Sequence, residues 1–376
     1  MNCELLHILF GADRGGCERD ALALIRSLPE VRHRVLVLGA PGTMCDDWIE
    51  AGAAVDIDPL GHHGNRSTVA AVRRFVEQHP PSAAMIWHGL VHLPQVIHAL
   101  NPLGIPIAVH GGNPTNLMSR WVDWRYELLG YVYPPKGPLP TYICCSQYVA
   151  DSFPKSRYLR RFPRVVVPNA VEMPNGQAHT VRPFDSERPF VIGMVARLNS
   201  IKDHATLLRA LAIVQRQFPN TRLELAGDGD ERQPLYHLAS ELGINSAIRF
   251  LGDVTGVYKL MEGWDLFAYA TTEGEGLGNA VTEAMMFGLP CVLTDVGPMR
   301  EFAGDGTAVR LVPPANPEAL AAAVCELIPD VAARSALSAA GREFALSRFH
   351  PENFARSHAE VLGLSSARQV SEPLRV

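Results

Sequence analysis

The sequence predicts an α/β protein built from two doubly wound, Rossmann-like domains that face each other across a cleft. Its 376 residues exceed what one ordinary hydrophobic core organises, which favours two domains. Short apolar runs alternate with segments of helical period, as expected for parallel strands covered by helices on both faces. The alternation stops once, near the middle of the chain, and then restarts.

The first half of the chain contains apolar runs with the length of buried strands, separated by segments of helical period. The clearest helical segments are "CERDALALIRSL" and "STVAAVRRFVEQH", and residues 141–153 predict a strand followed by a helix. The other strands are expected at residues 5–11, 33–39, 53–60, 83–89, 105–112 and 164–171.

A polar stretch, "MPNGQAHTVRPFDSER", contains proline and glycine and shows no period, so it predicts a linker. The predicted parts are an N-terminal domain (1–172), the linker (173–188), a C-terminal domain (189–350) and a C-terminal helical segment (351–376). That last segment either stays on the second domain or crosses back to the first. Ligands of such sheets bind where the strands have their carboxyl ends.

Composition excludes several classes of protein. The net charge is −5, so no global basic field favours nucleic acid as the main partner. No apolar run reaches about 18 residues and the N-terminus lacks the features of a signal peptide, so we expect a soluble, cytoplasmic protein. The seven cysteines are odd in number and form no CxxC pair, which favours buried thiols over disulfides or zinc ligands.

The stretch "TTEGEGLGNAVTEAMMFGLPCV" (271–292) combines glycines with carboxylates. We expect a helix that ends at Gly288, with Gly276 and Gly278 at its N-terminus, where backbone N–H groups favour a phosphate-like anion. That anion would repel Glu275 and Glu283, so both should bind neutral, hydroxyl-bearing neighbours. Eight residues along a helix span about 12 Å at most. Without its context, this spacing would indicate only a solvated helix face.

The segment "EGLGNAVTE" matches the E-x7-E motif, and the chain resembles the family 4 retaining glycosyltransferases with the GT-B fold through most of its length. Further matches occur in the expected order along the chain. They are "DRGGCERDALAL" with Gly15 and Gly16, "PIAVHGG" with His110, "VVVPNAVE" with Asn169, "VARLNSIKDH" with Arg197 and Lys202, "LAGDGD" with Gly227, and "RFLGDV" with Val254.

The resemblance implies a role for each matched residue. Glu275 would bind hydroxyls of the donor sugar and Glu283 those of the ribose, while Gly276, Leu277 and Gly278 would complete the phosphate site. Gly15 and Gly16 would face the diphosphate and the acceptor, and His110 would lie close to the donor sugar. Asn169, Gly227 and Val254 would contribute to donor binding. The first domain would therefore bind the acceptor and the second the nucleotide sugar.

Arg197 and Lys202 also make chemical sense without the resemblance. Breaking a sugar–diphosphate bond develops negative charge on the leaving oxygen, which positioned cations stabilise. The alternative is that both are solvated charges on the first turn of a helix. Their position directly after the first strand of the second domain favours the catalytic role.

The sequence departs from the family pattern at several positions. Ala196 and Asp203 stand where the family usually has glycine, and "ATT" replaces its usual Pro-Ser pair. The doubled "EGE" leaves Glu273 as an alternative sugar-binding acid, but Glu275 has the eight-residue spacing. These departures weaken the inference of this protein's donor from the donors of the family. They leave the fold prediction unchanged.

The predicted activity is transfer of a hexose-type sugar from a nucleotide-diphosphate sugar to an acceptor hydroxyl with retention of configuration. The resemblance implies front-face attack in which the leaving phosphate takes the acceptor's proton. We expect no cofactor and no obligatory metal, and interpret the D-x-D triplets at 56–58 and 228–230 as coincidences. A UDP-sugar is the favoured donor and a GDP-sugar the alternative. The alternative functions are a nucleotide-sugar epimerase and a degenerate, non-catalytic sugar-nucleotide-binding module.

The acceptor would be a glycan, a lipid-linked glycan or a small molecule. "FPKSRYLRRFPR" (153–164) and "LMSRWVDWRYELLGYVY" (117–133) combine basic and aromatic residues that would suit an anionic membrane surface. The alternative, a solvated basic loop beside a helix packed on the first domain, is slightly favoured. His88 follows a predicted strand and would line the acceptor side, although a loop or core histidine is the more common case.

Overall fold

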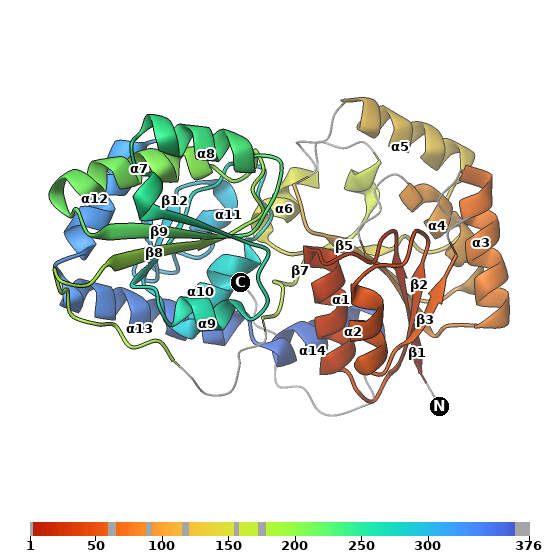
Figure 1. The fold of residues 1–376 in the computed structure, drawn as a ribbon. Helices are drawn as coiled ribbons and strands as arrows, with labels where there is room; N and C mark the ends of the chain where they lie inside the picture. The colour runs from red at the N-terminus through yellow and green to blue at the C-terminus, as the bar shows by residue number, and fades with distance from the viewer. Residues whose placement is uncertain are drawn as a thin grey trace. The chain divides into compact units, whose positions relative to one another are not determined.

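The computed structural model describes residues 3–58, 65–87, 92–114, 120–153, 158–171 and 178–364. The chain divides into an N-terminal unit (1–170 and 351–376) and a C-terminal unit (171–350) (Figure 1). His88, the start of the predicted linker and the end of the predicted C-terminal segment lie outside the described residues.

Within the described residues, the N-terminal unit has one parallel sheet with strand order β3-β2-β1-β4-β5-β6-β7. The strands are β1 (Glu4–Leu9), β2 (Arg32–Val37), β3 (Ala54–Ile57), β4 (Ala83–Trp87), β5 (Ile107–Gly111), β6 (Thr141–Cys144) and β7 (Arg164–Val166). The helices are α1 (Gly16–Ser27), α2 (Met44–Glu50), α3 (Asn65–Gln78), α4 (Leu93–Leu100), α5 (Arg120–Val132), α6 (Gln147–Ser152) and α14 (Pro351–Val361), and the 3-10 turns are η3 (Asn101–Leu103) and η6 (Leu159–Arg161).

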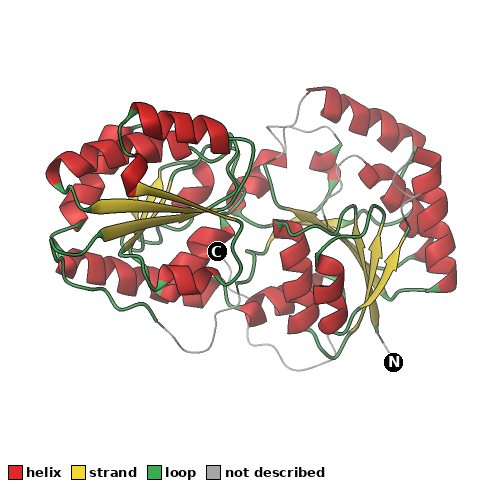
Figure 2. Ribbon diagram, in the orientation of Figure 1, coloured by secondary structure: helices red, strands yellow, loops and turns green. Residues whose placement is uncertain are grey.

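The C-terminal unit repeats this plan, with the parallel order β10-β9-β8-β11-β12-β13 in the part that the structure describes. Its strands are β8 (Phe190–Val195), β9 (Thr221–Ala226), β10 (Ile248–Gly252), β11 (Leu266–Tyr269), β12 (Cys291–Thr294) and β13 (Arg310–Val312). Its helices are α7 (His204–Gln217), α8 (Arg232–Glu241), α9 (Val257–Met261), α10 (Asn279–Phe287), α11 (Gly297–Arg300), α12 (Pro317–Leu327) and α13 (Val331–Arg348), and η7 is Asn245–Ala247. Figure 2 shows this sheet as a central layer with helices on both sides.

The predicted fold class of two parallel, Rossmann-like domains is confirmed by these two sheets. The central strands are buried on both faces, which explains why they appear as continuous apolar runs instead of alternating ones. In each sheet the strand order reverses next to the first strand, between β1 and β4 and between β8 and β11. Ligands of doubly wound sheets bind at this switch point.

Helix α14 packs on the N-terminal unit, although the chain reaches it from the C-terminal unit. It contacts α1, and its apolar face, including Phe354 and Ala359, joins the same buried core as Leu5 and Leu24. The chain therefore crosses back, which was one of the two alternatives for this segment.

Residues 178–188 fell within the predicted linker, and the structure attaches them to the C-terminal unit. Arg188 forms a two-pronged ion pair with buried Asp265, with N–O distances of 2.6 and 3.1 Å. The backbone N–H of His179 donates to the carbonyl of Phe287 at 2.7 Å. The polar composition of this segment thus reflects anchoring contacts, which a composition-based prediction cannot distinguish from solvation.

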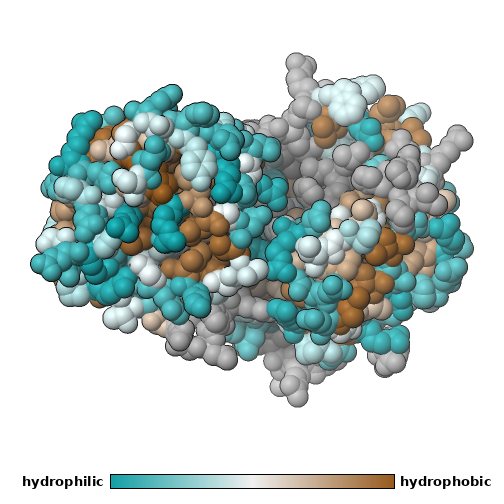
Figure 3. All heavy atoms as spheres, viewed as in Figure 1, coloured by the Kyte–Doolittle hydropathy of each residue, from teal (hydrophilic) through white to brown (hydrophobic). Residues whose placement is uncertain are grey.

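On the face shown in Figure 3, hydrophilic side chains predominate in both units, with apolar patches between them. Among the described residues, no helix combines the length and the apolar character needed to cross a membrane.

Candidate active site

The strand order of the C-terminal sheet brings two loops together at the switch point. β8 and β11 are neighbours, so the loops that follow their carboxyl ends meet at the same edge. The N–H of Asp203 donates to the carbonyl of Ala270 at 3.0 Å, and the N–H of Thr272 donates to that of Ile201 at 3.0 Å. The Asp203 side chain also caps α7 by accepting from the Thr206 N–H at 3.1 Å. The backbone around residue 202 is therefore fixed from both sides.

Lys202 and Glu275 form the centre of this site. The Lys202 ammonium donates to the Glu275 carboxylate and, at 2.7 Å, to the Tyr269 hydroxyl. That hydroxyl donates in turn to Glu275 Oε2 at 2.8 Å, and Glu275 Oε1 accepts from the Gly276 N–H at 3.1 Å. The exposed fractions of the Lys202 and Glu275 side chains are 13% and 11%. Every member is hydrogen-bonded, so the carboxylate has one orientation.

Tyr269 is a member of the site that sequence reasoning missed. It is the last residue of β11 and is buried, so the sequence pattern presents it as one more apolar residue of a core strand. The signal that could have found it is a phenol at the end of the apolar run "DLFAY", directly before the glycine-rich turn.

Burial determines the protonation of these groups. It lowers the pKa of the Lys202 ammonium below its ordinary value, and the nearby charge of Arg197 lowers it further. The Glu275 carboxylate opposes this shift, because a hydrogen-bonded anion favours the charged amine. Burial also raises the pKa of the Tyr269 phenol, and the Glu283 carboxylate raises it further. Tyr269 therefore stays protonated and donates, and Glu283 lies near the same phenol.

The glycine-rich turn ends at a helix, as predicted. α10 begins at Asn279 and ends at Gly288, and both of its flanking glycines have left-handed φ angles, +91° at Gly278 and +94° at Gly288. Glu275 precedes the helix and Glu283 lies within it, in agreement with a helix expected to start at the glycines. The N–H groups of the first turn and the positive end of the helix dipole suit an anion beside Gly276 and Gly278.

Arg197, Gly227 and Val254 lie at the same edge of the sheet, following β8, β9 and β10. Arg197 is exposed and Lys202 is not, and α7 begins only at His204, so the two do not lie on the first turn of a helix. At Gly227, with φ +133°, a Cβ would lie 2.0 Å from the Ala196 carbonyl oxygen. Only glycine lets the loop after β9 approach the loop after β8 this closely.

The N-terminal unit contains the remaining predicted residues. Gly15 caps α1 and Gly16 begins it, so both lie after β1 at the switch point of this sheet. His110 lies near the end of β5, and its Nε2 is 3.4 Å from the Asn169 amide oxygen. The predicted residues thus form two groups, one in each unit.

His110 is buried among side chains that the sequence did not single out. Its Nε2 is 3.8 Å from the Asp20 carboxylate, and its Nδ1 is 3.6 Å from the Cys17 sulfur. Burial, and then the Asp20 charge, raise the pKa of the Cys17 thiol, so this cysteine stays protonated and is no nucleophile. Both partners come from α1, which explains how a helix far away in sequence orients His110.

A second histidine cluster lies in the core beside His110. The Trp87 indole N–H can only donate, so His7 accepts at Nδ1 over 2.9 Å and carries its proton on Nε2. His7 then donates to His33 Nδ1 at 2.9 Å, and His33 Nε2 donates to the Leu28 carbonyl at 3.0 Å. Neutral rings satisfy every bond of this relay. Burial lowers the pKa of His7 and of His33, in agreement with that state.

No three histidine, cysteine or carboxylate residues gather as a metal site among the residues that the structure describes. The two D-x-D triplets are paired with arginines: Asp56 and Asp58 contact Arg34 and Arg74, and Asp228 contacts Arg232.

Comparison with known proteins shows which proteins the chain resembles. Residues 179–344 match the family model of the glycosyl transferases group 1. The chain is 26% identical to the putative glycosyltransferase EpsF of Bacillus subtilis, over 82% of this chain and 83% of EpsF. It is also 26% identical to the lipopolysaccharide core biosynthesis glycosyltransferase LpsD of Rhizobium meliloti, over 97% of this chain and 100% of LpsD.

The fold is shared with solved structures. The Anabaena protein HepE, crystallised with UDP and glucose, superimposes with a TM-score of 0.80 at 20% identity, over 96% of this chain and 100% of HepE. The family match and the relatives together support a glycosyltransferase with two Rossmann-like domains.

Proposed function

We propose that the protein is a metal-independent, retaining hexosyltransferase that takes its sugar from a nucleotide-diphosphate donor. The observation that carries this proposal is the Glu275 carboxylate, oriented by Lys202 and Tyr269 beside the glycine-rich turn before α10. A fixed carboxylate next to an anion-binding helix end suits a ligand that joins hydroxyls to a diphosphate.

The proposed reaction uses the charges at this edge of the sheet. The bond between the anomeric carbon and the diphosphate oxygen breaks, and negative charge develops on that oxygen. Lys202, Arg197 and the N-terminus of α10 stabilise this charge. The acceptor oxygen bonds to the anomeric carbon on the same face, and its proton passes to the leaving phosphate. Glu275 binds hydroxyls of the donor sugar and Glu283 those of the ribose.

The N-terminal residues complete the proposal. Gly15 and Gly16 approach the diphosphate and the acceptor, and His110 contacts the donor sugar, oriented by Asp20 and Asn169. Gly227 and Val254 border the nucleotide. We favour UDP as the nucleotide, because HepE binds UDP and UDP-glucose, and retain GDP as the alternative.

The acceptor is a glycan or a lipid-linked glycan in this proposal, which the role of LpsD in lipopolysaccharide core biosynthesis supports. Peripheral contact with an anionic membrane would bring the enzyme to a lipid-linked acceptor. The exposed aromatic residues Trp121 and Trp124 and the exposed, basic Arg164 support that contact. The relatives named above are glycosyltransferases, and none of them is named as an epimerase.

A thermal-shift screen tests the proposal. The purified protein is heated with UDP, GDP, ADP or TDP, and with their sugars, in the presence of EDTA. We expect one nucleotide, UDP first, to raise the melting temperature, since a ligand at about 100 times its Kd adds about 2.7 kcal/mol to native stability. The anomeric configuration of the product, read by NMR, then tests retention. A protein that no nucleotide stabilises would contradict the proposal and favour the non-catalytic module.

A further inference from the structure

Helix α5 exposes an aromatic face on the N-terminal unit. Trp121, Trp124, Leu128 and Tyr131 follow the spacing of one helical face, and their exposed fractions are 62%, 58%, 46% and 86%. Tyr126, on the opposite side, is buried. Over α5, Figure 3 shows pale and brown atoms with less of the teal that marks hydrophilic side chains elsewhere. Large aromatic side chains gathered at a surface indicate a binding face.

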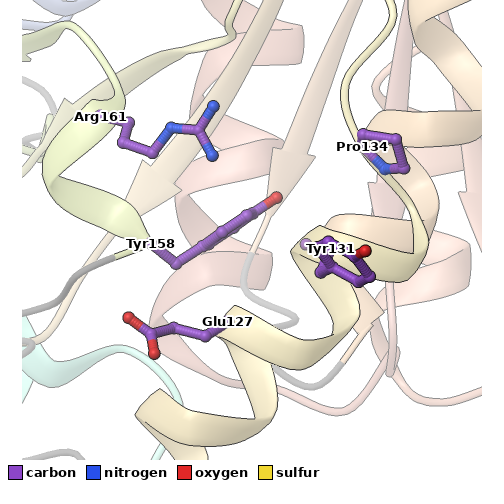
Figure 4. Close-up of a pocket in the computed structure, with 6 residues that line it drawn as sticks. Glu127, Tyr131, Pro134, Tyr158 and Arg161 are labelled. Carbon is purple, nitrogen blue, oxygen red and sulfur yellow. The ribbon is translucent and has the colours of Figure 1, made fainter.

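A pocket of about 500 Å³ opens beside the end of this helix, within the usual range for small-ligand sites. Figure 4 shows five of its lining residues, on α5, at Pro134 and in the segment from Tyr158 to Arg161; in this view the Glu127 side chain extends away from the side where Tyr131 and Pro134 lie. The lining residues are Glu127, Gly130, Tyr131, Pro134, Tyr158 and Arg161.

Tyr158 is built into the wall of this pocket. Its side chain is 4% exposed, and its buried hydroxyl has no hydrogen-bond partner among the described residues. Its ring lies so close to α5 that a Cβ at residue 130 would be 2.3 Å from it, so only glycine fits there. In Figure 4 the ring extends toward the side where Tyr131 and Pro134 lie. An unpaired buried hydroxyl costs stability, so it marks a place where a ligand can supply the missing bond.

The chemistry of the lining selects the ligand. Tyr131, Tyr158 and Pro134 offer apolar faces, Glu127 offers an acceptor, Arg161 offers donors, and the Tyr158 hydroxyl offers both. A phosphate would be attracted by Arg161 and repelled by Glu127, and an amine would meet the reverse. A neutral sugar ring has an apolar C–H face and hydroxyls that donate and accept, so it matches both parts of the lining.

We propose that this pocket binds a neutral hexopyranose unit of the acceptor, through stacking on Tyr131 and hydrogen bonds to Tyr158, Arg161 and Glu127. The assignment of that sugar to the acceptor rests on the proposed function. The binding itself does not, because it needs only the N-terminal unit's own residues.

Saturation-transfer difference NMR on the full chain tests the pocket. The probes are the methyl α-pyranosides of glucose, galactose and mannose. Three variants remove one contact each: Tyr158→Phe keeps the ring and loses the hydroxyl, Arg161→Gln loses the charge, and Tyr131→Ala truncates a ring that is 86% exposed. The control is Arg160→Gln, which changes a neighbouring exposed arginine outside the lining.

We expect at least one glycoside to bind and each of the three variants to weaken it by at least about fivefold, as for a lost hydrogen bond or stacking contact. The Arg160→Gln control should bind as the wild type does. Absence of binding by all three glycosides would overturn the proposal, as would binding that Tyr158→Phe and Arg161→Gln leave unchanged.

Sedimentation with vesicles of phosphatidylcholine and phosphatidylglycerol tests whether the pocket binds lipid instead of a sugar. Vesicle binding that Arg161→Gln abolishes, without glycoside binding, would assign the pocket to lipid and overturn the sugar proposal. Failure here is distinguishable from failure of the proposed function, because nucleotide binding is measured separately and none of these residues belongs to the C-terminal site.

Discussion

Each unit contains a cluster of buried polar side chains. The two clusters are stabilised in different ways. In the C-terminal unit, an ammonium and a carboxylate are held next to each other, with the Tyr269 phenol bridging Lys202 and Glu275. In the N-terminal unit, His7, His33 and Trp87 are buried as neutral rings that end on a backbone carbonyl.

This difference distinguishes a functional site from a structural core. A buried ion pair costs desolvation that neutral neighbours would avoid, so its presence at a sheet's switch point indicates chemistry. A relay of neutral rings carries no charge and satisfies its own hydrogen bonds, so it stabilises the fold. His110 has features of both clusters, since it contacts Trp87 of the neutral cluster and also faces the Asp20 carboxylate.

After the loss of Glu275, the largest effect is expected for Lys202→Ala. Loss of the ammonium removes charge stabilisation that is needed only as the leaving oxygen becomes negative, so kcat should fall about 10²–10³-fold while the donor KM changes little. Steady-state kinetics with the donor found by the thermal-shift screen measures both. Lys259→Ala, an exposed lysine on α9, is the matched control and should retain full activity. A Lys202→Ala variant as active as this control would remove Lys202 from the mechanism.

A smaller effect is expected for Tyr269→Phe. The ring stays and only the hydroxyl that bridges Lys202 and Glu275 is lost, so kcat should fall about tenfold, which corresponds to about 1.4 kcal/mol.

The pH profile distinguishes this positioning role from simple loss of packing. The phenol accepts from the ammonium, so its removal destabilises the charged amine and lowers the pKa of Lys202 further. The alkaline limb of the pH–kcat profile should therefore move to lower pH in Tyr269→Phe. A uniform loss of rate, with the limb unmoved, would show that the hydroxyl does not act through Lys202.

The smallest expected effect concerns stability and belongs to the neutral cluster. Burial lowers the pKa of His358, which stacks on Trp87, to about 3. Because the unfolded chain takes up this proton near pH 6.5 and the folded chain does not, stability is full above that pH and is lost as pH falls. Between pH 6.5 and 5 this one histidine should cost about 2 kcal/mol.

Urea unfolding at pH 7.5 and pH 5 measures this loss, with His358→Leu for comparison. The variant binds no proton at this position, so its free energy of unfolding should fall less than that of the wild type over the same interval. Equal losses in the two proteins would show that His358 is not held neutral by the fold.

The sequence was sufficient for the fold and for the positions of Lys202 and Glu275 at strand ends, while the roles of these residues stay predictions. Continuous apolar runs predict buried parallel strands, and the switch-point rule places residues such as Lys202 and Glu275 at the strand ends. Tyr269 was missed because a buried aromatic at a strand end has the pattern of a core residue. Asp20 and Cys17 were missed because their proximity to His110 depends on how α1 packs against β5, which periodicity does not encode.

The attachment of residues 178–188 and the position of α14 show the same limit. Both depend on single tertiary contacts, such as the ion pair of Arg188 with Asp265 and the burial of Phe354. Composition and helical period describe each segment by itself, so they cannot tell which unit it packs on.

The most direct test of the central claim compares Glu275→Ala with Glu273→Ala in a transfer assay. Both glutamates lie in the same turn, but Glu275 is buried against Lys202 and Tyr269, and Glu273 is exposed and accepts from the Gly297 N–H at 3.1 Å. We expect Glu275→Ala to lose transfer by at least about 10³-fold while it stays folded, at a lower melting temperature because the Lys202 ammonium loses its partner, and Glu273→Ala to stay within about threefold of the wild type. An active Glu275→Ala beside an inactive Glu273→Ala would show that the sugar-binding carboxylate is that of Glu273 and contradict the site described here.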